Sequence, residues 1–122
     1  MKKLTPKEEQ IMQILWRLEN AFLKDIWEEL SEPRPPITTT ASIVKKLENE
    51  GFIDHETFGR MHRYFPKVAK VDYRTSSLKS LVHNYFEGSP AQLLSHFVKE
   101  ESLDAEEIAR LLKEIKKKEN EE

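Results

Sequence analysis

Apolar residues recur at intervals of three and four along the first half of the chain, which predicts three amphipathic helices. The three stripes are Ile11, Ile14, Leu15 and Leu18, then Leu23, Ile26, Trp27 and Leu30, then Thr40, Ile43, Val44 and Leu47. Thr5–Glu8 has the residues of a capping box with proline at the first helical position, so the first helix begins there. A proline-rich connector over 31–36 follows the second helix, and Gly51 ends the third, which we expect from about Thr38 to Glu50.

After Gly51 the apolar period shortens to about two residues, which is typical of strands. We expect strands over 52–57 and 61–65, joined by a hairpin turn at Phe58–Arg60, whereas Glu19–Ala21 is expected to be a break between the first two helices. This order of elements is that of a winged helix-turn-helix, in which the third helix enters the major groove of DNA. The same order also suits a protein-interaction module, so the architecture alone leaves both functions open.

Three more helices are predicted after residue 70, two of them introduced by the capping sequences Ser89–Gln92 and Asp104–Glu107. Their apolar stripes are candidates for a dimer interface: Leu78, Leu81, Val82, Tyr85, Leu93, Leu94, Phe97, Val98, Ile108, Leu111, Leu112 and Ile115. The amino-terminal core is too small to cover these stripes, and a second copy of the chain is the simplest partner. The alternative is a monomer in which the stripes fold back onto residues 1–66.

The fold class that follows is mainly α (α+β), with two domains. We expect a winged helix-turn-helix DNA-binding domain over residues 1–69 and a helical dimerisation domain over residues 70–122. A two-fold dimer would place its recognition helices about 34 Å apart, or a multiple of that distance, which predicts a palindromic operator.

Composition and charge narrow the function further. The chain has no stretch of about 18 apolar residues and no signal-peptide core, so we expect a cytoplasmic protein without membrane insertion. It has no cysteine, which excludes disulfides, thiolate metal sites and thiol redox sensing. The net charge is −2, but residues 34–74 carry eight Lys and Arg against five Asp and Glu, so the middle of the chain is basic.

The third helix presents a polar face opposite its apolar stripe, with hydroxyls first and lysines after them. Short hydroxyl side chains can approach base edges, and lysines can reach phosphates. We expect at least one of Thr38 and Thr39 also to cap the helix, and for Lys45 and Lys46 the alternative is an ordinary solvated face. With the hairpin, the candidate DNA-binding residues are Thr38, Thr39, Ser42, Lys45, Lys46, Arg60, His62 and Arg63.

The four histidines, His55, His62, His83 and His96, do not form a catalytic motif. His55-Glu56 resembles the start of a zinc-protease motif, but the next histidine follows the glutamate by six residues rather than three, on a predicted strand. The sequence also has no glycine-rich phosphate loop and no nucleophile elbow. We therefore expect no enzyme activity, no catalytic residues, no metal site and no cofactor.

Taken together, the order and spacing of several short segments resemble the penicillinase-repressor family, the BlaI, MecI and CopY type of transcriptional regulator. The resemblance runs from about Leu4 to Leu112. It is carried by Leu4-Thr5, Ile14-Leu15-Trp16, Thr38-Thr39, Lys46-Leu47 through Gly51, Gly59-Arg60, Tyr64, Pro66, Tyr73, Phe86–Ser89, Leu94, Leu103 and Glu106-Glu107. It implies a homodimeric repressor that binds palindromic operators of resistance genes and represses its own operon.

For the antibiotic-responsive branch, the resemblance implies that a membrane-bound sensor with a metalloprotease domain causes cleavage of the repressor. The cleavage site would fall at His96-Phe97 of this chain, where His96 stands in place of the asparagine common in that branch. The alternative role of Phe97 is that of a buried residue in the dimer interface. The copper-responsive branch uses carboxy-terminal cysteines, and this chain has none.

Overall fold

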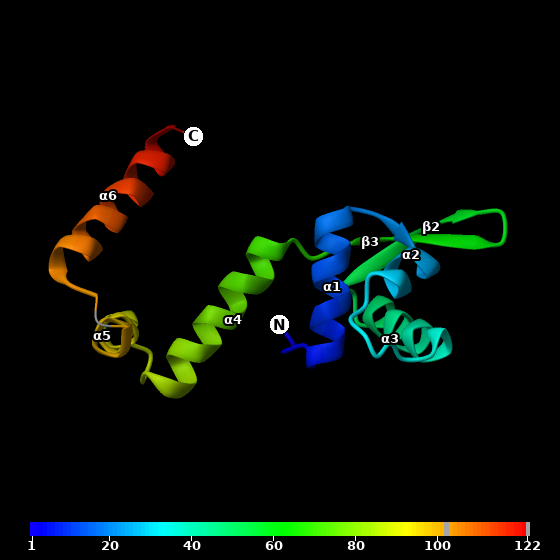
Figure 1. Cartoon of the computed structure of the whole chain (residues 1–122), viewed down its shortest axis with the longest axis horizontal. Helices are drawn as coiled ribbons and strands as arrows, with labels where there is room; N and C mark the ends of the chain where they lie inside the picture. The colour runs from blue at the N-terminus through cyan, green and yellow to red at the C-terminus, as the bar shows by residue number, and fades with distance from the viewer. Residues whose placement is uncertain (102, 122) are drawn as a thin grey trace. The chain divides into compact units, whose positions relative to one another are not determined.

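The computed structural model describes residues 1–101 and 103–121. The chain divides into two compact units, the first covering Met1–Ser77 and the second beginning at Leu78. The elements are α1 (Pro6–Leu18), β1 (Ala21–Phe22), α2 (Leu23–Glu28), α3 (Ile37–Asn49), β2 (Ile53–Phe58), β3 (Met61–Pro66), α4 (Lys70–Tyr85), α5 (Pro90–Glu101) and α6 (Ala105–Glu121), as Figure 1 shows. The mainly helical α+β class with one small sheet is the class predicted from the sequence.

The core of the first unit lies where α1, α2, α3 and the sheet meet. Its buried apolar residues are Leu4, Ile11, Met12, Ile14, Leu15, Ala21, Ile26, Leu30, Val44, Leu47, Phe52, Ile53 and Tyr73. All three predicted stripes contribute to this core, which confirms the helical period. Ile43 is only partly buried and packs against the core from its edge.

α1 begins with the capping box that the sequence predicts. The Thr5 hydroxyl accepts a hydrogen bond from the Glu8 amide at 3.3 Å, and the Glu8 carboxylate accepts one from the Thr5 amide at 2.9 Å. These bonds satisfy amides that have no partner inside the helix. Glu8 is only 2% exposed, and the ammonium of Lys2 lies 3.1 Å from its carboxylate, so this buried charge is paired.

α3 begins at Ile37, and neither Thr38 nor Thr39 caps it, so the predicted threonine cap was wrong. The reason is that Pro36 occupies the position before the helix and makes no side-chain hydrogen bond to it. The Pro36 carbonyl instead accepts hydrogen bonds from the amides of Thr39 and Thr40, at 3.0 and 3.3 Å. Thr38 and Thr39 therefore lie inside the first turn, with exposed side chains.

The sheet has three antiparallel strands in the order β1-β3-β2, whereas the sequence predicted only two strands. β1 contributes the pairs Ala21↔Tyr64 and Phe22↔Arg63. A strand of two residues is too short to show alternation, so its sequence indicates only a break between helices. Its pairing with β3 is a tertiary contact that local pattern does not reveal.

β2 and β3 form the predicted hairpin, which extends away from the helices of the first unit (Figure 1). Phe58 lies opposite Met61, and the turn between them consists of Gly59 and Arg60. Gly59 has a φ of 62°, a left-handed conformation that glycine adopts without strain. The hairpin is the wing of the winged helix, and its tip carries Arg60.

The first turns of α4 belong to the amino-terminal core. The Tyr73 side chain is buried, and its hydroxyl accepts a hydrogen bond from the Leu4 amide at 3.0 Å. Its ring also meets the ring of Phe52 edge to face at 6.3 Å. The compact units consequently divide between residues 77 and 78, whereas the domain boundary at residues 69/70 stays a prediction from the sequence.

In the second unit, the first residue of each predicted capping sequence caps its helix. The Ser89 hydroxyl accepts a hydrogen bond from the Gln92 amide at 3.2 Å, and the Asp104 carboxylate accepts one from the Glu107 amide at 2.8 Å. Within residues 1–101 and 103–121, no helix is both long enough and apolar enough to cross a membrane.

The apolar stripes of α4, α5 and α6 remain largely uncovered in the single chain. The exposed members are Leu78, Leu81, Tyr85, Leu94, Phe97, Leu111, Leu112 and Ile115. The partly buried members are Val82, Leu93, Val98 and Ile108. Exposed fractions of 40 to 75% on so many large apolar side chains are unusual for a monomer and typical of an interaction surface.

Candidate nucleic-acid interface

α3 has one fully buried face and one fully exposed face. Thr40, Val44 and Leu47 point into the core and have no exposed surface. The exposed face carries the five residues that the sequence singled out on this helix: Thr38, Thr39, Ser42, Lys45 and Lys46. The helical register therefore brings these five side chains to one solvent-facing surface, which we call the α3 face.

The amino end of α3 supports the α3 face electrostatically. The first amides of any helix lack partners within it and carry a partial positive charge. Pro36 supplies no side-chain cap. Among the described residues, its carbonyl accepts only from the Thr39 and Thr40 amides, so the amides of Ile37 and Thr38 are left for a ligand or solvent. Such an end favours a phosphate oxygen, and Thr38 and Thr39 lie directly beside it.

The two lysines of the α3 face differ in their surroundings. The Lys46 ammonium lies 3.8 Å from the Glu8 carboxylate, so part of its charge is already balanced. Lys45 forms no ion pair with any residue that the structure describes. The Ser42 hydroxyl donates a hydrogen bond to the Thr38 carbonyl at 3.2 Å, one turn back along the helix. Of these side chains, Lys45 is the most available for a new partner.

The predicted wing residues also fall into two groups. Arg60 is exposed at the hairpin tip, as expected. Arg63 is partly buried because it pairs with Glu56 at 3.1 Å and lies over the Phe58 ring at 4.5 Å. His62 is exposed, but its ring stacks on that of His55 at 3.9 Å and 6°. Arg63 and His62 therefore have intramolecular contacts that DNA binding would have to keep or replace.

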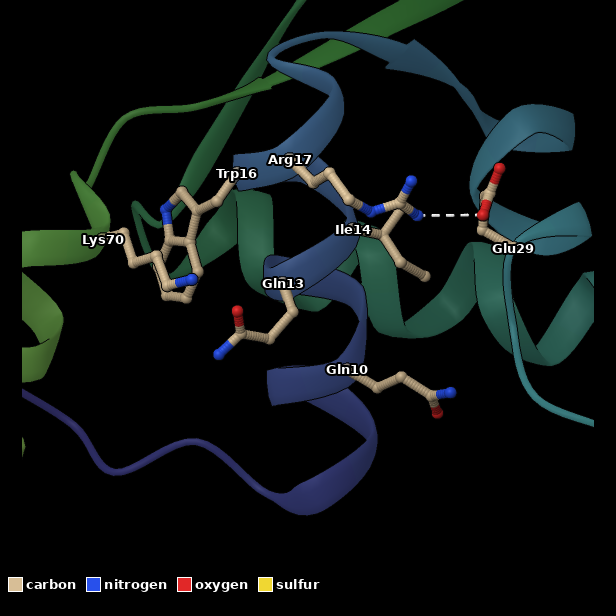
Figure 2. A pocket seen from close by; sticks show the side chains of 7 residues that line it. All are labelled: Gln10, Gln13, Ile14, Trp16, Arg17, Glu29 and Lys70. Atoms are coloured by element: carbon tan, nitrogen blue, oxygen red, sulfur yellow. Dashed lines mark hydrogen bonds and ion pairs between the residues drawn. The ribbon is translucent and has the colours of Figure 1, made fainter.

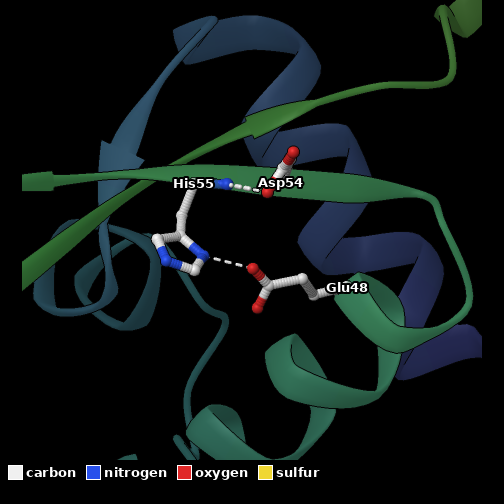
Figure 3. Close-up of side chains that lie close together, drawn as sticks. All are labelled: Glu48, Asp54 and His55. Carbon is white, nitrogen blue, oxygen red and sulfur yellow. Dashed lines mark hydrogen bonds and ion pairs between the residues drawn. The ribbon is translucent and has the colours of Figure 1, made fainter.

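The structure brings together one cluster that the sequence did not predict. Glu48 near the end of α3 lies beside Asp54 and His55 at the start of β2, with their ligand-type atoms all within 4.8 Å of one another. Figure 3 shows the His55 imidazole facing the Glu48 carboxylate, which contacts its Nδ1. Burial and, secondarily, the Glu48 charge raise the pKa of the nearby Tyr64 hydroxyl. No sequence motif indicates this cluster. Glu48 meets Asp54 and His55 only because the chain reverses direction at the turn around Gly51.

A surface depression along α1 has a volume of about 460 Å³. It is lined by Gln10, Gln13, Ile14, Trp16, Arg17, Glu29 and Lys70 (Figure 2). Arg17 pairs with Glu29 at 2.8 Å, and the Trp16 indole donates to the Val68 carbonyl at 2.8 Å. Figure 2 shows these side chains directed to both sides of the helix rather than toward one point. The depression therefore lacks the convergent polar groups of a ligand site.

Comparisons with known proteins agree with this architecture. The chain is 26% identical to the methicillin resistance regulatory protein MecI of Mammaliicoccus sciuri over 117 residues, which cover 95% of each chain. It is 22% identical to the penicillinase repressor of Bacillus licheniformis over 119 residues, covering 97% of this chain and 93% of that one. A solved structure, the DNA binding domain of the repressor BlaI, superposes with a TM-score of 0.52 at 25% identity, covering 60% of this chain and 94% of that one.

The family model described as penicillinase repressor matches residues 4–117, which is nearly the whole chain. The sequence resemblance is thereby confirmed, as is the expectation that this is not an enzyme. The chain belongs to the penicillinase repressor family of DNA-binding transcriptional repressors.

Proposed function

We propose that this repressor binds a palindromic operator as a homodimer, with the α3 face in the major groove and the wing along the flanking backbone. The observation that carries the proposal is the α3 face itself. It combines exposed hydroxyls, a helix end without a side-chain cap, and lysines on one side of a helix whose other side is buried in the core. Hydroxyls suit base edges, while lysines and helix amides suit phosphates.

The stripes of α4, α5 and α6 support the dimeric part of the proposal. A DNA-reading domain of this type gains affinity and specificity when two copies occupy two half-sites. The exposed apolar residues Leu94, Phe97, Leu111 and Ile115 give a second copy a surface to cover. A two-fold arrangement makes the same surface serve both copies, so the operator should repeat as an inverted pair of half-sites.

Binding to the DNA upstream of the protein's own gene tests the proposal. We expect a mobility shift that survives excess unrelated DNA and weakens steeply as salt is raised, because lysine–phosphate contacts release counterions. A footprint with two inverted half-sites about one helical turn apart, or a multiple of it, would fit the dimer. Binding that ignores sequence and salt would favour the other candidate, a winged-helix module that contacts proteins.

We also propose which kind of gene the repressor controls and which signal releases it from DNA. By analogy with its relatives, the chain would control resistance-type genes, with a membrane-bound sensor-protease as its partner and cleavage at His96-Phe97 as the release step. Both residues are exposed in the single chain. If Phe97 is covered in the dimer, cleavage requires the interface to open. Mass spectrometry of the protein from induced cells should then show fragments ending at His96, and intact protein after induction would rule this step out.

A further inference from the structure

We propose that Glu48, Asp54 and His55 bind a divalent transition-metal ion of the zinc class, and that this ion strengthens DNA binding. One imidazole nitrogen and two carboxylate oxygens form a ligand set that zinc accepts, with room left for water. The claim that the ion strengthens DNA binding rests on the proposed function, whereas the metal site itself does not.

The geometry of the three side chains supports a shared ion. Their candidate ligand atoms lie within 4.8 Å of one another. A common ion at bond lengths of about 2.0 to 2.2 Å could be reached by all three after small movements of the side chains. Figure 3 shows Glu48 and His55 already facing each other, with the Asp54 carboxylate on the other side of β2. To admit an ion, the Glu48 carboxylate and His55 Nδ1 would have to move apart, because they are in direct contact. The Asp54 carboxylate would have to approach them and give up the hydrogen bond that its Oδ1 accepts from the His55 amide at 2.8 Å.

Among the residues that the structure describes, the Glu48 and Asp54 carboxylates differ from several carboxylates of the first unit in having no lysine or arginine partner. Glu8, Glu29 and Glu56 each pair with a lysine or arginine at 2.8 to 3.1 Å. Over residues 1–101 and 103–117, by contrast, no lysine or arginine pairs with Glu48 or Asp54. The one ion-pair partner of Glu48 is His55, which is charged only when protonated. A divalent ion would supply the missing positive charge.

The His55 ring is held in the orientation that the site needs. The His62 ring stacks on it at 3.9 Å, and the Tyr64 ring meets it edge to face at 5.9 Å. With 26% of the His55 side chain and 24% of the Glu48 side chain exposed, the cluster is sheltered but open to an ion from solvent. His62 is thus a positioning residue, in the way that groups around a metal site fix the direction of its ligands.

The position of the cluster connects it to DNA. Glu48 lies one turn beyond Lys45, so the two side chains share a side of α3. Two carboxylates without a lysine or arginine partner repel a nearby phosphate backbone, and an ion would cancel that repulsion. The ion would also tie the end of α3 to β2, and therefore to the wing. Both effects tighten binding to DNA.

Metal binding is measured first, on the free full-length protein after treatment with EDTA and dialysis. Co²⁺ should produce a visible absorption band, and Zn²⁺ should displace it and bind with one ion per chain in calorimetry. In His55→Gln and, separately, Glu48→Gln, the affinity for Zn²⁺ should fall at least about tenfold. His83→Gln, which removes a histidine from α4, is the matched control and should bind as the wild type does. Unchanged affinity in His55→Gln, or an equal loss in His83→Gln, would overturn the site.

The second experiment compares the operator affinity of the protein in Zn²⁺ with that in EDTA. Wild-type affinity should rise about tenfold with Zn²⁺, a typical size for coupling between two sites, and His55→Gln should show no rise. Metal binding with no effect on operator affinity would overturn the coupling and leave the site standing. Metal binding without any sequence-specific DNA binding would overturn the proposed function alone, so the two failures are distinguishable.

Discussion

Glu8 shows how one residue serves both local structure and long-range packing. Its backbone amide and its carboxylate form the two bonds of the capping box, and that carboxylate also receives Lys2 at 3.1 Å and lies 3.8 Å from Lys46. Burial alone would raise the pKa of the carboxyl, but the hydrogen bonds from Thr5 and Lys2 outweigh it and hold the pKa below the usual 4.5. The charged form is therefore the one that the folded protein prefers.

A pH prediction follows from that lowered pKa. The unfolded chain takes up a proton at Glu8 before the folded chain does, so this contribution to stability is present above pH 4.5 and is lost as the pH falls below it. In Glu8→Gln, the free energy of unfolding should be lower by about 1 kcal/mol at pH 7 and should fall less between about pH 5 and pH 3. Urea denaturation at each pH measures this, with the exposed neighbour Glu9→Gln as control. An acid dependence identical to that of the wild type would contradict the assignment.

Thr40 is a buried polar residue whose hydroxyl lacks, among the described residues, a hydrogen bond to offset the loss of contact with water. It has no exposed surface, and within the part of the chain that the structure describes its hydroxyl has no hydrogen-bond partner. Valine has the same shape without the hydroxyl, so Thr40→Val should raise the free energy of unfolding by about 1 kcal/mol. Thermal and urea denaturation measure the change. A loss of stability would mean that the hydroxyl is hydrogen-bonded in solution.

The residues of the α3 face should separate into two kinds by their effect on DNA binding. Thr39→Ala should change the preference among operator sequences by about 1 kcal/mol, because a hydroxyl near base edges discriminates between bases. Lys45→Ala should weaken binding to all sequences alike and reduce the salt dependence by about one counterion. Anisotropy titrations over a set of operators and salt concentrations measure both, with Lys24→Ala on α2 as control. The reverse pattern would exchange the two roles.

At the scale of elements, the strong apolar periodicity of the helices was sufficient to predict them. An element without such periodicity was not predicted. The apolar stripes of α1 and α3 predicted the bounds of those helices to within a residue or two, because apolar residues spaced three and four apart mark the buried face of a helix. β1 has only two residues and carries no such spacing. The predicted cap of α3 was wrong for a different reason, since Pro36 occupies the N-cap position where a threonine was expected.

α4 contacts the amino-terminal core through the Tyr73 ring and through the hydrogen bond between the Tyr73 hydroxyl and the Leu4 amide. A single substitution can remove this hydrogen bond. Tyr73→Phe keeps the ring and its contacts but leaves the Leu4 amide, 69 positions earlier, without its acceptor. The free energy of unfolding of the first unit should fall by about 1 to 2 kcal/mol, the cost of an unsatisfied buried amide. Denaturation of the full chain measures this, with Tyr85→Phe, which is exposed, as control. Equal stability would show that solvent reaches Leu4.

At the scale of the whole molecule, the stripes of α4, α5 and α6 predict a dimer on which DNA affinity depends. Leu111→Glu combined with Ile115→Glu, two exposed residues of the α6 stripe, should produce monomers in sedimentation. Operator affinity should fall at least about a hundredfold, because the second half-site is no longer bound in the same complex. Arg110→Ala, on the opposite side of α6, should change neither. A dimer that persists in the double variant would move the interface away from α6.

The sequence by itself determined the helices, the hairpin, the polar side of α3 and the family, because each depends on residues close together in the chain or on their order. Only the tertiary structure decided which of those residues meet. It paired β1 with β3, joined Tyr73 to Leu4, and engaged His62 and Arg63 within the wing. It also placed Glu48 beside Asp54 and His55. These contacts depend on the direction that the chain takes after each turn, and that direction is set by the packing of the whole core rather than by local pattern.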